Sequence, residues 1–129
     1  QLLEGDWLAP RSRLCVISSI WQDIARPDKL SYCVTKSALR GLVQSVALDL
    51  GSRGMLINAV LPGALDTPMT RANLSAPQID RLAGMTPVGH LPALDNVCAA
   101  VQFLCSPGNT SVTGQFIAVD GGFSYAKVL

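Results

Sequence analysis

A tyrosine and a lysine lie four residues apart in this sequence, at Tyr32 and Lys36. Side chains at that spacing project from one face of a helix, one turn apart. An ammonium group close to a phenol stabilises the phenolate form, so the pair could exchange a proton with a substrate. Thirteen residues before Tyr32 lies Ser19, whose hydroxyl could orient a carbonyl or an alcohol beside the phenol. The alternative is that Tyr32 and Lys36 are ordinary surface side chains of an amphipathic helix.

Two elements would position these residues. Residues 13–18 form a short apolar run rich in β-branched side chains, which predicts a buried parallel strand that ends at Ser18 and Ser19. A long helix is expected from residue 29 or 30 to residue 50. It is apolar over so much of its surface that it should be buried on more than one side. We expect one face to pack on a sheet and another on a second subunit.

The remainder of the chain continues this alternation of strands and helices. Further strands are expected at residues 55–61 and 116–119, further helices at 75–84 and 93–105, a loop at 64–74, and the end of a helix at 1–9. Such an order predicts a right-handed parallel α/β layer that forms part of a doubly wound protein. In open sheets of this type, ligands bind at the carboxyl ends of the strands.

Composition excludes several classes of function. The chain has 129 residues, which is at most one domain, and its net charge is only +1, with no basic or acidic run. Nothing in it would attract nucleic acid or a membrane surface, and its longest apolar runs are far short of a membrane span. The four cysteines match no metal-binding or redox spacing. We expect free, buried thiols, no metal site and a cytoplasmic location.

Four motifs occur in a fixed order along the chain. They are Ser18-Ser19, Tyr32 with Lys36, the run from Asn58 through Pro62-Gly63 to Thr67, and Thr113-Gly114-Gln115 followed by Asp120-Gly121-Gly122. This order resembles the C-terminal, catalytic half of the short-chain dehydrogenase/reductase family, over residues 14–123. The resemblance implies that residues 1–129 are a single partial domain. Its fold would be the C-terminal part of a doubly wound parallel-sheet Rossmann fold, with about three strands and flanking helices.

The resemblance also implies a hydride transfer between a nicotinamide cofactor, NAD or NADP, and an alcohol or carbonyl substrate. Tyr32 would be the general acid/base, Ser19 would orient the carbonyl, and Lys36 would assist Tyr32 and bind the nicotinamide ribose. The implied cofactor-binding residues are Tyr32, Lys36, Pro62, Gly63, Leu65 and Thr67. Of the side chains that could line the substrate pocket, we name Trp21, Met69 and Met85, although each could equally be ordinary packing.

The glycine-rich phosphate loop of this family does not occur in these 129 residues, nor does its Asn-Asn-Ala-Gly segment. We therefore expect this chain to supply the catalytic half of the site, completed by other residues of the protein or by a second chain. The alternative is a truncated, inactive fragment that serves as an association module. In both cases a homo-oligomer, a dimer or a tetramer, is expected through the long helix. The substrate, the choice between NAD and NADP, and the direction of reaction stay open.

Overall fold

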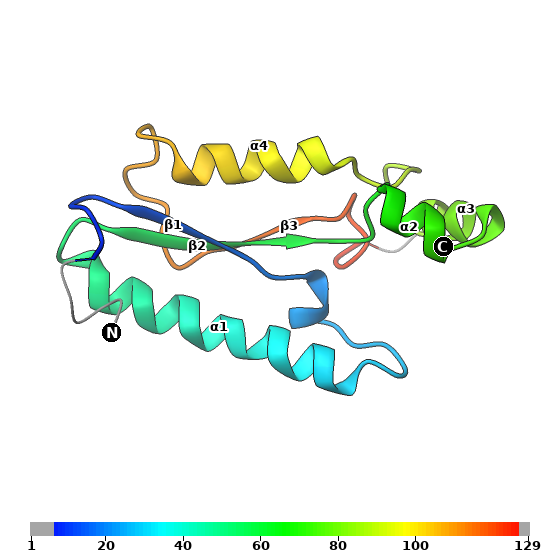
Figure 1. Ribbon diagram of the computed structural model, residues 1–129, viewed down its shortest axis with the longest axis horizontal. Coiled ribbons are helices and arrows are strands. Elements are labelled where there is room, and N and C mark those ends of the chain that lie inside the picture. The colour runs from blue at the N-terminus through cyan, green and yellow to red at the C-terminus, as the bar shows by residue number, and fades with distance from the viewer. Residues whose placement is uncertain (1–6, 127–129) are drawn as a thin grey trace.

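The computed structural model, which describes residues 7–126, is built on the central strand β2 (Leu56–Pro62) (Figure 1). Strand β1 (Arg13–Ile17) pairs with it on one side and β3 (Phe116–Val119) on the other, both in parallel. Every residue of β2 before its final proline is buried. A nearly continuous apolar run is typical of a strand covered on both faces of a sheet, and the one polar residue, Asn58, is buried with its side chain hydrogen-bonded to Val112 and Gln115. The parallel sheet predicted from the sequence is therefore confirmed.

One helix covers each face of the sheet (Figure 1). Helix α1 (Leu30–Gly51) packs Val43 against Ile57, Ala59 and Leu61 of β2. Helix α4 (Leu94–Cys105) packs Val97 and Leu104 against Val60, which points to the opposite face. Successive side chains of a strand point to opposite sides, so β2 contributes to both layers of the core. This arrangement confirms the doubly wound α/β class.

The handedness of the connections differs from the expectation. The strand order is β1-β2-β3, so both crossovers step in the same direction across the sheet. Their helices nevertheless lie on opposite faces, and the two crossovers therefore have opposite hands (Figure 1). The expected right-handed layer is wrong for one of them. Right-handed crossovers are a strong preference and not a requirement, and the second connection passes through two short helices before it reaches α4.

These two helices are α2 (Pro68–Asn73) and α3 (Ala76–Gly84). The second matches the helix expected at residues 75–84, but the first lies inside the region expected to be a loop. Thr67 caps α2, because its side chain accepts a hydrogen bond from the backbone amide of Thr70, and Pro68 follows at the first turn. Both are helix-start signals that the sequence interpretation overlooked. Similarly, the segment after β1 contains a short 3₁₀ helix, η1 (Ile20–Gln22).

Two other expectations need correction or fall outside the described residues. Residues 1–6, where most of the expected first helix end would lie, are outside the described range, and residues 7–12 form turns and a bend without any helix. All four cysteines are free, as expected, but only Cys15 and Cys33 are partly buried. Cys98 and Cys105 are exposed, so the expectation of buried thiols is wrong for these two. No helix between residues 7 and 126 has the length and apolar character needed to cross a membrane.

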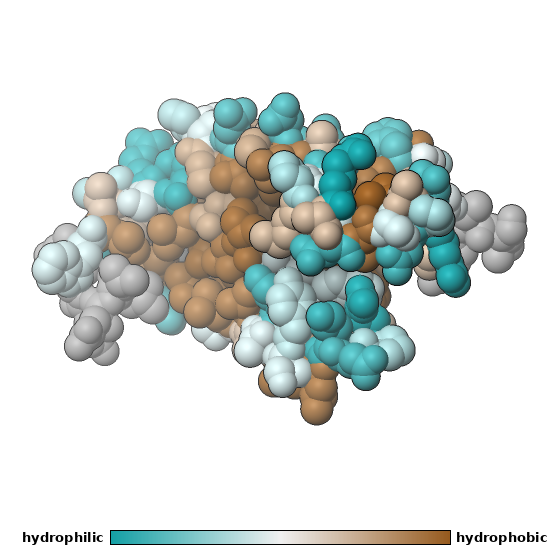
Figure 2. All heavy atoms as spheres, turned by 45° about the vertical axis from the view of Figure 1, so that its right-hand side comes forward, coloured by the Kyte–Doolittle hydropathy of each residue, from teal (hydrophilic) through white to brown (hydrophobic). Residues whose placement is uncertain are grey.

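The outer face of α1 remains apolar and exposed. Leu30, Val34 and Leu42 recur at multiples of four residues and are 80%, 59% and 47% exposed. Among the described residues β1 is an edge strand, and none of its residues is fully buried: four are partly buried, and Ile17 is 49% exposed. Figure 2 shows a broad hydrophobic area in the middle of the face that it displays. Association with a second subunit through α1 stays a prediction.

Candidate active site

The carboxyl ends of the three strands meet at one edge of the sheet, because all of the strands run in the same direction. The backbone amide of Ser18 donates to the carbonyl of Val60 at 2.9 Å, and that of Gly63 donates to Val119 at 3.0 Å. A Cβ atom placed on Gly63 would lie 2.7 Å from the Cβ of Asp120, so only glycine permits this approach. The strand ends are thus held in register by backbone contacts.

The two serines after β1 have different environments. Ser18 is buried, and its hydroxyl donates to the side-chain oxygen of Gln22 at 2.9 Å. Ser19 is only 6% exposed, and its Oγ accepts a hydrogen bond from the backbone amide of Trp21 at 3.3 Å, which caps η1. Because the Oγ of Ser19 is an acceptor here, its own proton remains available for the oxygen of a bound molecule. Ser19 therefore has the free donor that the predicted role requires.

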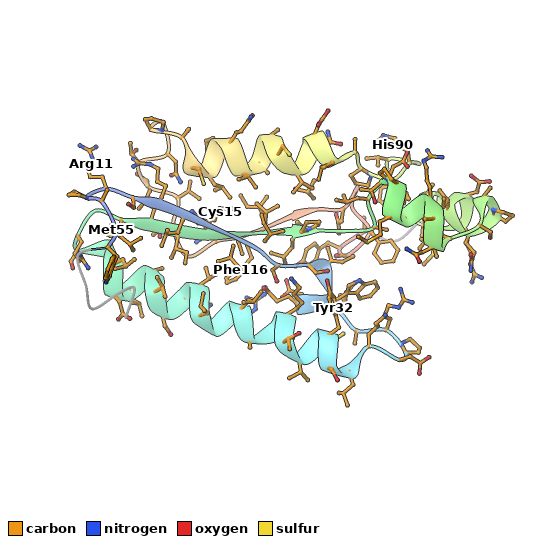
Figure 3. All side chains as sticks on the ribbon, viewed as in Figure 1. Arg11, Cys15, Tyr32, Met55, His90 and Phe116 are labelled. Carbon is orange, nitrogen blue, oxygen red and sulfur yellow. The ribbon has the colours of Figure 1, made fainter. Side chains whose placement is uncertain are left out.

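Tyr32 and Lys36 lie on the first two turns of α1. The Nζ atom of Lys36 is 5.7 Å from the centroid of the Tyr32 ring, and it donates to the carbonyl of Ile17 at 3.2 Å. This bond ties the helix to the end of β1 and holds the ammonium group beside the phenol. Tyr32 lies at the same end of the molecule as the carboxyl ends of the strands, far from Arg11 and Met55 (Figure 3).

A cavity of about 1100 Å³ opens at this edge of the sheet, which is large enough to hold a small molecule. Ser19, Tyr32 and Gly63 all line it, although they come from three different elements. This convergence argues against the alternative that Tyr32 is an ordinary surface side chain, even though it is 43% exposed. The three side chains named for the substrate pocket, Trp21, Met69 and Met85, also line the cavity.

The other predicted site residues lie around the cavity and do not line it. Lys36 stands beside Tyr32, as described above. The hydroxyl of Thr67 lies 3.1 Å from that of Thr70 in addition to capping α2, so it has a structural role at this point. Pro62 ends β2, and Leu65 packs with the core cluster beneath α4. Within residues 7–126, no His, Cys, Asp and Glu side chains are grouped so as to hold a metal ion.

A carboxylate that the sequence interpretation missed braces the cavity wall. Asp23 accepts from Arg40 at 2.6 Å, from the hydroxyl of Tyr125 at 3.2 Å and from the side chain of Gln22 at 3.3 Å. Burial raises the pKa of Asp23, but the hydrogen bonds from Arg40 and Gln22 outweigh this effect and lower it overall. The contacts join the segment after β1, α1 and the C-terminal segment. No sequence signal could have found them, because Asp23 and Tyr125 are 102 residues apart.

Comparisons with known proteins show that the chain is similar to oxidoreductases. Residues 3–124 match the family model described as enoyl-(acyl carrier protein) reductase. The chain is 38% identical over 114 residues to (3R)-3-hydroxyacyl-CoA dehydrogenase of Canis lupus familiaris, covering 87% of this chain and 43% of that protein. It is 35% identical over 121 residues to 3-oxoacyl-(acyl-carrier-protein) reductase of Pseudomonas aeruginosa, covering 94% and 49%. The chain thus spans about half the length of the curated relatives it matches.

Two solved structures have a similar fold. A gluconate 5-dehydrogenase from Burkholderia cenocepacia, in complex with NADP and tartrate, superimposes with a TM-score of 0.80 at 34% identity. The match covers 87% of this chain and 44% of that one. A blue fluorescent protein from a metagenomic library, in complex with NADPH, gives a TM-score of 0.83 at 33% identity, covering 92% and 47%.

Proposed function

Because the chain belongs to the short-chain dehydrogenase/reductase family, we propose that the protein transfers a hydride between a nicotinamide cofactor and an alcohol or carbonyl substrate. The observation that carries this proposal is the convergence of Ser19, Tyr32 and Gly63 on one cavity at the carboxyl edge of the sheet. In open α/β sheets that edge is where ligands bind. The two solved relatives, which are complexes with NADP and NADPH, support a cofactor of the same class.

Tyr32 moves the proton in this mechanism. In the direction of reduction its hydroxyl gives a proton to the substrate oxygen, while the hydroxyl of Ser19 donates a hydrogen bond to the same oxygen. The ammonium group of Lys36 stabilises the phenolate that remains, and the carbonyl of Ile17 fixes the position of that ammonium group. The cofactor supplies or accepts the hydride. In the direction of oxidation, the phenolate of Tyr32 removes the proton from the alcohol.

The residues at the end of β2 fit the nicotinamide end of such a cofactor. Gly63 packs so closely on Asp120 that no side chain is possible there, which leaves bare main chain at the cavity wall. Pro62, Leu65 and Thr67 surround this turn, and we assign the nicotinamide to these residues together with Tyr32 and Lys36. The family's glycine-rich phosphate loop does not occur in the 129 residues. The proposal therefore gives this chain only the nicotinamide end of the dinucleotide.

Self-association is the second part of the proposal. The apolar outer face of α1, with Leu30, Val34 and Leu42 exposed, supports a homodimer or a tetramer built on this helix. The same face would also serve the alternative, in which the chain is an association module without redox activity. The two possibilities differ in one respect, because only an enzyme needs the hydroxyl of Tyr32.

Replacing that hydroxyl tests the proposed function in the full-length protein. Oxidation of NADH and NADPH is followed with a panel of ketones, aldehydes and 3-oxoacyl compounds. Tyr32→Phe should lower kcat by roughly 10²- to 10⁴-fold, which is the usual contribution of a general acid or base, and should leave nucleotide affinity largely intact. Tyr125→Phe is the matched control: it removes the hydroxyl of the chain's other tyrosine, which does not line the cavity. It costs only the bond to Asp23, so it should lower kcat far less than Tyr32→Phe.

Lys36→Ala should weaken both turnover and nucleotide affinity, because the ammonium group is assigned to the phenol and to the nicotinamide ribose. An unchanged nucleotide affinity in Lys36→Ala would refute the ribose contact. A kcat in Tyr32→Phe equal to that of the unaltered protein would refute the role of Tyr32 and favour the association module.

A further inference from the structure

The cavity wall carries more positive than negative charge. Three cations line it, Arg26, Lys29 and Arg81, against a single carboxylate, Asp120. Asp120 is 5% exposed, and its two oxygens accept from the backbone amides two and four residues further along the chain, at 2.9 Å and 2.8 Å. Its charge is therefore engaged by the turn that follows β3. Asp120 therefore does not neutralise the three cations of the cavity.

The three cations have no ion-pair partner within residues 7–126. Other arginines near the site are paired: Arg40 with Asp23 at 2.6 Å, and Arg71 with Asp66 at 2.7 Å. Asp28 lines a smaller adjoining hollow together with Arg26 and Lys29, and it forms no ion pair with either of them. Unlike Arg40 and Arg71, these three cationic side chains are therefore available to a ligand.

Arg26 is the cation whose position is best defined. The centre of its guanidinium group lies 5.6 Å from the ring centroid of Trp21, a cation–π contact that leaves its N–H donors free. Trp21 in turn meets Phe123 edge to face, with ring centroids 6.4 Å apart. Both rings line the cavity. Arg26 is thus stacked on an aromatic platform at the cavity wall.

The rest of the wall is mainly apolar. Its apolar side chains come from several segments and include Ile20, Ile24, Leu74, Leu82 and Leu91. Among the residues assigned to the nicotinamide, Pro62, Leu65 and Thr67 do not line the cavity. Tyr32 and Gly63 do line it, but the three cations come from other segments: Arg26 and Lys29 precede α1, and Arg81 lies on α3. We therefore assign the cations to the substrate and not to the nicotinamide.

From these contacts we infer that the substrate is an organic oxyanion, with a carboxylate or a phosphate on an apolar body. Arg26 binds the oxyanion through its planar fork of donors, while Ser19 and Tyr32 address the carbonyl or the alcohol. Lys29 and Arg81 add positive potential around the same cavity. This inference rests on the proposed function, since it names the substrate class of that site.

Binding of three probes to the full-length protein, measured by calorimetry near neutral pH, tests the inference. Octanoate and octyl phosphate carry an oxyanion on the same apolar chain, whereas octanamide is the neutral counterpart of octanoate. We expect at least one of the two anions to bind about tenfold or more tightly than octanamide, because a charge-assisted hydrogen bond replaces a neutral one. The anion that binds more tightly, octanoate or octyl phosphate, indicates whether the substrate carries a carboxylate or a phosphate.

Variants then locate the preference. Arg26→Gln should reduce the ratio of anion to amide affinity to near one, and Arg26→Lys, which keeps the charge, should retain most of it. Arg11→Gln removes the same charge at the opposite end of the molecule and should leave the ratio unchanged (Figure 3). The affinity for NADPH should be the same in Arg26→Gln as in the unaltered protein.

Three results would overturn the inference: no preference for either anion, a preference that survives in Arg26→Gln, or a parallel loss of NADPH affinity in that variant. None of these touches the assay of Tyr32, so the proposed function would stand. Conversely, a protein with the anion preference that never transfers a hydride would refute the proposed function and keep the anion site.

Discussion

Gly63→Ala should separate the ends of β2 and β3, because the added methyl group has no space. Its carbon would lie 2.7 Å from the Cβ of Asp120 and 2.9 Å from the Cα. Carbon atoms in ordinary contact are about 3.5–4.0 Å apart, so the two strand ends must move apart by about 1 Å. Asp120 cannot simply rotate away, since one clashing atom belongs to the backbone and its carboxylate is bound to two backbone amides.

Inserting a methyl group into such a packed contact costs about 1–3 kcal/mol of unfolding free energy. A displacement of about 1 Å at the cavity wall should also lower kcat/KM, on the order of 100-fold. Urea unfolding and steady-state turnover measure the two effects. Gly51→Ala is the matched control, because a Cβ at this helix end meets nothing within 4 Å, and it should be neutral or stabilising by up to about 1 kcal/mol. If Gly63→Ala were as stable and as active as Gly51→Ala, the close contact between the strand ends would be wrong.

Two further predictions concern titratable groups. Asp23→Asn should destabilise the protein at pH 7 by about 1 kcal/mol through the loss of the bonds from Arg40 and Tyr125. The pKa of Asp23 is lowered in the folded state, so the loss of stability in Asp23→Asn should be complete above the ordinary carboxyl range and should shrink as the pH falls through the lowered pKa. Urea unfolding of both proteins at pH 7 and pH 3 measures this loss. An equal loss at the two pH values would contradict the reasoning. Burial raises the pKa of the Cys15 thiol, so iodoacetamide near neutral pH should alkylate the exposed Cys98 well before Cys15. Peptide mass spectrometry over a time course measures the two rates, and labelling of Cys15 at the rate of Cys98 would show that β1 is not covered as described.

The elements of the fold were predictable where a single local pattern specifies them. The run of β2, apolar except for Asn58, indicates burial on both faces, and the four-residue spacing of Tyr32 and Lys36 fixes their common face without tertiary information. What the sequence could not give depends on contacts between distant segments. The anchor of Lys36 is a backbone carbonyl, which carries no residue-type signal, and the brace at Asp23 joins segments 17 and 102 residues away. The opposite hands of the crossovers likewise follow from packing and not from element order.

The geometry of the proposed site depends on the register of the sheet more than on any one loop. The end of β1 carries Ser19 and the carbonyl that anchors Lys36, while the end of β2 carries Gly63. A slip of one residue between β1 and β2 would move Ser18 into the place of Ser19 and would turn the anchoring carbonyl away from Lys36.

The walls of the cavity that face the substrate come from different parts of the chain. They are formed by the segment around η1, by α2 and α3, and by the residues that follow β3. Substitutions in those walls can change what is bound without moving a strand end, and Arg26 belongs to this group. In the proposed function, the residues of proton transfer thus lie mainly at the strand ends and on α1, and those of substrate choice mainly in the cavity walls. The first group has motifs with a fixed spacing, which made it recognisable from the sequence. In the second group, Trp21, Met69 and Met85 were named from the sequence, whereas Arg26 and the other two cations became visible only once the cavity was assembled.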